Sequence, residues 1–231
     1  MLEDYFTYCY WPERDEPPKK TAERMSAFLK GLGRQDAAFG RWFEQAKSLK
    51  RALELEFEPA PEALERLLKK NKYALIFSAW NGRSDEEEGC DMRMSRGSLG
   101  IVPGRCMLNL RPIGRLWERV GTSTGLAAVM RCMALAWEPE WGISSSHDHW
   151  ESLSPKPELG EFVGWITYYP RSRGTVPPLP APVRIEPVED LGALVILTPE
   201  RFTLHNPAHV ELAARVRELL GRAGLLTPLR K

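Results

Sequence analysis

The chain lacks most of the patterns by which enzymes and nucleic-acid-binding proteins are recognised. Its 231 residues include 32 basic and 31 acidic side chains, a formal net charge of +1, so the basic excess of a dedicated nucleic-acid binder is missing. No Walker lysine motif is present, and Gly31 and Gly33 lack the third glycine and the preceding strand of a dinucleotide-binding loop. We therefore expect no catalytic residues, no cofactor and no direct binding of nucleic acid, and no hydrolase elbow of the G-x-S-x-G type.

Signals for secretion and membrane insertion are missing as well. Residues 1–5 place acids where a secretory signal peptide has basic residues, and no run approaches the roughly 20 apolar residues of a membrane span. The cysteines form no C-x-x-C pair; they are Cys9, Cys90, Cys106 and Cys132. We expect a cytoplasmic protein without membrane contact, whose thiols are free and mostly buried.

Histidine is scarce, and its spacing does not predict a metal site. Zinc needs three or four nitrogen or sulfur ligands at fixed spacing, but Pro207 and a capping residue separate His205 from His209. The segment 144–148 contains the residue types of a Ser-His-Asp triad, although a triad is built from separated segments that meet in space. We expect no metal. An enzyme of unknown reaction that uses His147, Asp148 and His149 remains an alternative.

Tryptophan, by contrast, is abundant, with eight residues in the chain. Several lie where a predicted strand or helix ends: Trp11, Trp80, Trp137, Trp141 and Trp165. Tryptophan is enriched both in protein cores and at protein–protein contacts. A chain rich in such anchors and poor in chemistry is typical of a binding protein.

Hydrophobic periodicity predicts a single α+β domain over residues 1–231, with a largely antiparallel sheet and helices packed on it. Strands are expected at 5–10, 73–80, 91–95, 106–111, 141–144, 163–169, 183–188 and 193–198. The run 73–80 is expected to be a central strand covered on both faces, and 73–111 to form a meander. Helices are expected to begin at Thr21, Asp36, Pro61, Ser123 and Asn206, and the second is expected to bury Phe39, Trp42, Phe43 and Ala46.

Two polar or proline-rich segments stand out. The acidic loop, Asp85, Glu86, Glu87 and Glu88, is usually a solvated loop, but its charge could also attract a basic partner surface. The stretch 177–182 is rich in proline and is typical of a stiff connector between strands, or of a polyproline ligand.

The order and spacing of several short pieces resemble the immunity protein 52 family. The pieces are 5–11 with Arg14; Phe28-Leu29 followed by Asp36, Phe39 and Trp42; Trp80-Asn81-Gly82; 136–141; 163–168; 178–180; 183–187; and 206–209. Together they run along nearly the full length, and the segment 83–120 matches least well.

The resemblance implies an antitoxin that binds and neutralises one cognate toxin of a bacterial polymorphic toxin system, with no catalytic motif of its own. It also implies a toxin with a restriction-endonuclease-like nuclease domain. Occlusion of the toxin's active site is the expected mechanism, and the acidic loop is the expected toxin-binding segment. A structural adaptor protein without a toxin partner is a further alternative.

Overall fold

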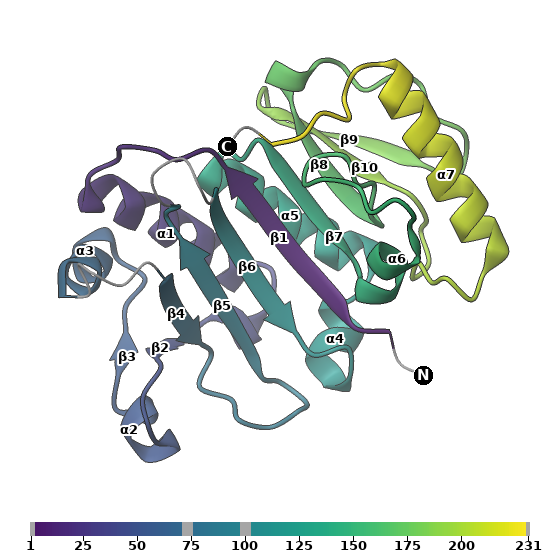
Figure 1. The fold of residues 1–231 in the computed structure, drawn as a ribbon. Coiled ribbons are helices and arrows are strands. Elements are labelled where there is room, and N and C mark those ends of the chain that lie inside the picture. The colour runs from purple at the N-terminus through teal and green to yellow at the C-terminus, as the bar shows by residue number, and fades with distance from the viewer. Residues whose placement is uncertain (1–2, 71–75, 98–102, 230–231) are drawn as a thin grey trace.

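The computed structural model describes residues 3–70, 76–97 and 103–229, and its described strands form one antiparallel sheet (Figure 1). Its strands are β1 (Tyr5–Trp11), β2 (Trp42–Glu44), β3 (Glu56–Phe57), β4 (Ile76–Trp80), β5 (Cys90–Ser95), β6 (Gly104–Leu110), β7 (Trp141–Ser146), β8 (Ile166–Pro170), β9 (Arg184–Val188) and β10 (Gly192–Ile196). They lie in the order β3-β2-β4-β5-β6-β1-β7-β8-β10-β9. The predicted α+β class with a largely antiparallel sheet is therefore confirmed.

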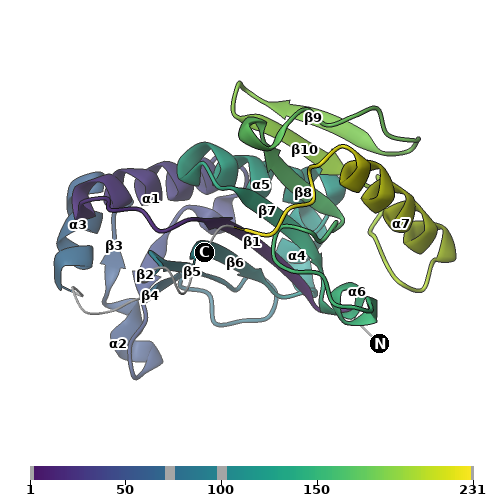
Figure 2. The same ribbon diagram turned by 45° about the horizontal axis from the view of Figure 1, so that its top comes forward.

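The helices are α1 (Pro18–Gly33), α2 (Leu49–Leu53), α3 (Pro61–Lys70), α4 (Gly114–Val120), α5 (Ser123–Trp137), α6 (His147–Ser152) and α7 (Pro207–Arg222), with short 3₁₀ turns at Ala37–Phe39 and Arg171–Arg173. Helix α5 contacts β1, β7 and β8, and α1 packs on α5 and on α3. Figure 2 shows α1 and α5 together on one side of the sheet. None of the described helices is long and apolar enough to cross a bilayer.

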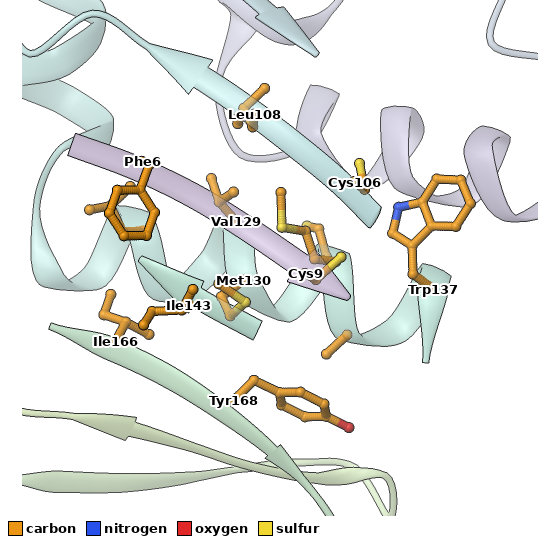
Figure 3. Packing of buried hydrophobic residues seen from close by; sticks show 14 of the residues in the cluster. Phe6, Cys9, Cys106, Leu108, Val129, Met130, Trp137, Ile143, Ile166 and Tyr168 are labelled. Atoms are coloured by element: carbon orange, nitrogen blue, oxygen red, sulfur yellow. The ribbon is translucent and has the colours of Figure 1, made fainter. Parts of the chain in front are cut away.

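The core lies between this helix layer and the strands. The apolar stripe of α5, from Leu126 to Trp137, is buried as its periodicity predicts. Trp137 stacks on Trp11 with ring centroids 4.8 Å apart, and Figure 3 shows its indole nitrogen turned toward Cys106. All the cysteines are free and buried, as expected.

The helix predicted to start at Asp36 is wrong. Asp36 does accept a hydrogen bond from Ala38 N at 2.9 Å, but it caps only the 3₁₀ turn Ala37–Phe39. Gly40 then ends the turn, and Trp42 and Phe43 enter β2, where Phe43 pairs with Trp80. Aromatic residues fit strands, and the pairing of Phe43 with a strand far along the chain decides the segment. Trp42 is nevertheless fully buried.

Further differences concern the start of the first helix and three short helices. The first helix begins at Pro18 instead of Thr21, because a proline fits the first turn of a helix without losing a hydrogen bond. The short helices α2, α4 and α6 lack an apolar stripe long enough to reveal them in the sequence. The helices at Pro61, Ser123 and Asn206-Pro207, the meander β4-β5-β6 and the hairpin β9-β10 are confirmed.

Candidate interaction surface

The strands β4, β5, β6 and β1 have one face that no described helix covers. Helices α1 and α5 lie on their other face, while α2 and α6 stand at the ends of the uncovered side (Figure 2). Burial alternates along β4, where Phe77 and Ala79 are buried under the helix layer but Ile76 is 50% exposed. The prediction that 73–80 is covered on both faces is therefore wrong for its described part, and residues 73–75 lie outside the described residues.

Strand register places a defined set of side chains on this uncovered face. They form three rows across β1, β6, β5 and β4: Phe6, Asn109, Asp91 and Trp80; Tyr8, Met107, Arg93 and Ser78; Tyr10, Arg105, Ser95 and Ile76. Because successive side chains of a strand alternate between faces, the neighbours of these residues point into the core. The sequence pattern that could have found the face is the polar–apolar alternation of β5 and β6, which the sequence does show.

A hollow of about 660 Å³ lies at the first row, between the uncovered face, α2 and the loop that follows β4. Phe6, Tyr8 and Trp80 line it from the sheet, and Leu49 lines it from α2. Leu49 is 51% exposed although it is a large apolar side chain. Exposed apolar side chains gathered around a concavity mark a surface for a protein partner or a ligand.

A second, smaller cavity of about 180 Å³ adjoins the hollow, and we call it the aromatic pocket. Its walls are Phe6, Tyr8, Tyr10, Trp141, Trp150 and Phe162, with Arg105, Ile143, His147 and Leu159. The rings of Tyr10 and Trp141 stack at 5.8 Å. Phe6, Tyr8 and His147 line both cavities, so the two are continuous parts of one surface.

The acidic loop lies at the rim of the hollow, because Asp85 lines it. Its charges are not free. Glu86 pairs with Arg111 at 3.1 Å, Glu87 with Arg115 at 3.8 Å, and Glu88 with Arg119 at 2.8 Å. Hydrogen bonds from Arg119 hold the pKa of Glu88 below its ordinary value.

The loop also has a structural role that the sequence did not reveal. The carboxylate of Asp85 accepts a hydrogen bond from Glu88 N at 2.8 Å, and Glu87 Oε2 accepts one from Arg115 N at 3.2 Å in the first turn of α4. Glu86 and Glu87 remain 70% and 58% exposed. Their contact with a partner stays a prediction.

The histidine segment does not converge on one site. His147 is exposed and faces Asp4, with 3.8 Å between Nε2 and Oδ2. His149 is buried between Phe162 and Phe202, and its Nδ1 lies 3.3 Å from Ser145 Oγ. Burial lowers the pKa of His149 to about 4. Residues two apart on a helix do not face each other, so the two imidazoles serve different surroundings.

His209 acts as a structural residue. Its Nδ1 accepts a hydrogen bond from Thr203 N at 3.1 Å and its Nε2 lies 3.0 Å from Glu200 Oε1, whereas His205 is exposed ahead of α7. Within the described parts of the chain, no three His, Cys, Asp or Glu side chains are placed to hold a metal ion.

The G-x-S-x-G motif of a hydrolase elbow does occur, contrary to expectation, at Gly121-Thr122-Ser123-Thr124-Gly125. They span the end of the α4–α5 connection and the first turn of α5, whereas an elbow follows a strand. Thr122 caps α5, and the buried Ser123 hydroxyl donates to Pro199 O at 2.7 Å. This serine holds a helix start in place and is not exposed as a nucleophile.

Comparisons with known proteins give a family match and a similar solved structure. The family model described as immunity protein 52 matches residues 3–229. Among solved structures, the Pseudomonas aeruginosa T6SS protein PA0821 is similar, at 12% identity and a TM-score of 0.55, over 95% of this chain and 80% of that one. At such identity the likeness shows a shared fold. No curated protein matches the chain.

Proposed function

Because the chain belongs to the immunity protein 52 family, we propose that it is a cytoplasmic antitoxin that binds a cognate bacterial toxin and neutralises it. The uncovered sheet face with its hollow is the observation that supports a toxin-binding surface on this side of the molecule. Immunity by binding needs a surface that is apolar enough to be buried and shaped enough to be specific. The hollow supplies the shape, and Leu49 and Trp80 supply apolar surface at its edge, while much of its lining is polar.

The anchors of this surface match the residues that dominate protein–protein affinity. Tryptophan, tyrosine and arginine are enriched among interface hot spots, and the face presents Trp80, Tyr8 and Arg105. Trp80 is half-buried, so part of its ring remains open to a partner.

The toxin we propose is a nuclease with a restriction-endonuclease-like domain, inhibited by occlusion of its active site. A nuclease cleft must attract phosphates and is therefore basic. Asp85 and Asp91 line the hollow together with Arg83 and Arg111, and the acidic loop stands at its rim, so a basic cleft that docks here would meet carboxylates along part of its edge. Charge of this kind speeds encounter, and the buried anchors slow dissociation.

The alternatives have less support. An enzyme built on 147–149 would need His147 and His149 to act together, but one is exposed and the other is buried between phenylalanines. A structural adaptor without a toxin would use the same uncovered face, and no observation favours it over the family's function.

Co-expression tests the proposal. A host that produces the toxin domain encoded beside this gene is expected to survive only when the chain is also produced. Death of the host despite normal levels of folded chain would contradict the proposal. Survival with a catalytically inactive toxin is the control for toxicity of expression itself.

A further inference from the structure

We propose that the aromatic pocket receives an acidic side chain of the partner protein, whose carboxylate pairs with Arg105. The inference rests on the proposed function, because the partner is the toxin. It adds a second, oppositely charged contact to the one expected at the acidic loop.

The pocket has the size and lining of an anchor site. Its volume of about 180 Å³ suits one side chain, and aromatic rings from β1, β7, α6 and the segment before β8 form its walls. Rings of this kind pack well against the methylene groups of a glutamate or aspartate. Trp150 meets Phe162 edge to face at 5.0 Å, so the wall is already ordered without a ligand.

Arg105 supplies a positive charge that no described carboxylate neutralises. It lies on β6 opposite Tyr10, is exposed, and contacts the Tyr10 phenol. Arg93, one row away, differs in having Asp91 at 3.7 Å. No carboxylate lines the aromatic pocket, so a guanidinium at its edge is available to a carboxylate from outside.

The charge at the pocket also favours an acidic anchor. The guanidinium of Arg105 is the polar group at the edge of the pocket. A lysine or arginine of the partner would meet a like charge there, and a purely apolar anchor would leave the guanidinium without a counter-charge. A carboxylate is the group that matches it.

The hollow and the pocket differ in the charges of the side chains that line them. Both signs line the hollow, which has Asp4, Asp85 and Asp91 with Arg83 and Arg111, whereas the pocket has Arg105 and no carboxylate. A partner with a basic group facing the hollow and an acidic one facing the pocket would dock in one orientation only. Such a pattern also discriminates against toxins of other charge arrangement.

The test measures binding of the purified chain to the inactive toxin domain encoded beside its gene. Arg105→Met keeps the bulk and removes the charge, and Arg105→Lys keeps the charge. Arg66→Met, on the exposed side of α3, is the matched control. We expect Arg105→Met to weaken affinity about tenfold or more, Arg105→Lys to recover part of the loss, and Arg66→Met to leave affinity unchanged.

The outcomes separate this inference from the proposed function. Wild-type chain that fails to bind the toxin contradicts the proposed function. Wild-type chain that binds, with Arg105→Met equally tight, overturns the inference alone. A loss in Arg105→Met that is equally large at low salt and at about 0.5 M salt also overturns it, since a neutral acceptor would then be the ligand. Thermal melting of each variant confirms that the fold is kept.

Discussion

The structure gives its most specific prediction for a variant in which the acidic loop is neutralised. The change replaces Asp85 with Asn and Glu86, Glu87 and Glu88 with Gln. The four loop carboxylates and Asp36 face three guanidinium groups, those of Arg111, Arg115 and Arg119, which leaves two net negative charges within this set of side chains. The variant would carry two net positive charges there.

This reversal should act on the rate of encounter with a basic toxin. We expect association at low salt to slow by about tenfold, with a smaller effect on dissociation and a weaker dependence of binding on salt. The folding cost should be small, because exposed ion pairs contribute roughly 0–1 kcal/mol each. Asn at position 85 keeps an acceptor for Glu88 N, so the turn of the loop should persist.

Stopped-flow or surface-based kinetics with the inactive toxin domain measure the effect. The matched control neutralises Glu189, Asp190, Glu211 and Glu218, which lie in the β9–β10 turn and on α7 (Figure 1). An association rate at low salt that is the same in wild type and loop variant would contradict electrostatic steering by the loop. The loop would then serve only to hold α4 through its ion pairs.

Two further predictions concern the core. Trp137→Ala should lower the free energy of unfolding by roughly 3–5 kcal/mol, since its ring is 1% exposed and stacked on Trp11, and Trp42→Ala should behave alike. Denaturant unfolding measures this loss. Unchanged stability together with lost toxin binding would instead make both tryptophans interface residues. Burial lowers the pKa of His149 to about 4, below its ordinary value of 6.5. Between these two pH values the unfolded chain binds a proton that the folded chain does not, so stability falls as the pH falls, by roughly 3 kcal/mol in all. His149→Gln should flatten that part of the stability–pH curve, and an unchanged slope would contradict the buried neutral state.

Much of the fold follows from local signals in the sequence. The helix α5 is marked by an apolar stripe and the hairpin β9-β10 by its turn residues, and both signals act over a few residues only. The failure at Asp36 has the same origin. Its cap is real, but Gly40 and the pairing of Phe43 with Trp80 end the helix after one turn. Pairing with a strand far along the chain is not visible in a local pattern.

The candidate surface could be predicted only in part. The near-continuous apolar run that ends at Trp80 suggested burial on both faces, yet Ile76 is exposed and Trp80 is half-buried. The core of an interface resembles a protein core, so a strand that is to be covered by a partner has the sequence pattern of a buried strand. The charge of the acidic loop is evident from the sequence. Its ion pairs with Arg111, Arg115 and Arg119 are not, because these arginines lie far from the loop along the chain.

The most direct test of the central claim compares two exposed leucines on opposite sides of the sheet. Leu49 lines the hollow and is 51% exposed, whereas Leu135 is 40% exposed on α5, which lies on the other face. The affinity of each Leu→Glu variant for the inactive toxin domain is measured by calorimetry. We expect Leu49→Glu to lose binding and Leu135→Glu to bind like wild type. Loss of binding by Leu135→Glu alone would place the toxin on the helix layer and contradict docking at the hollow.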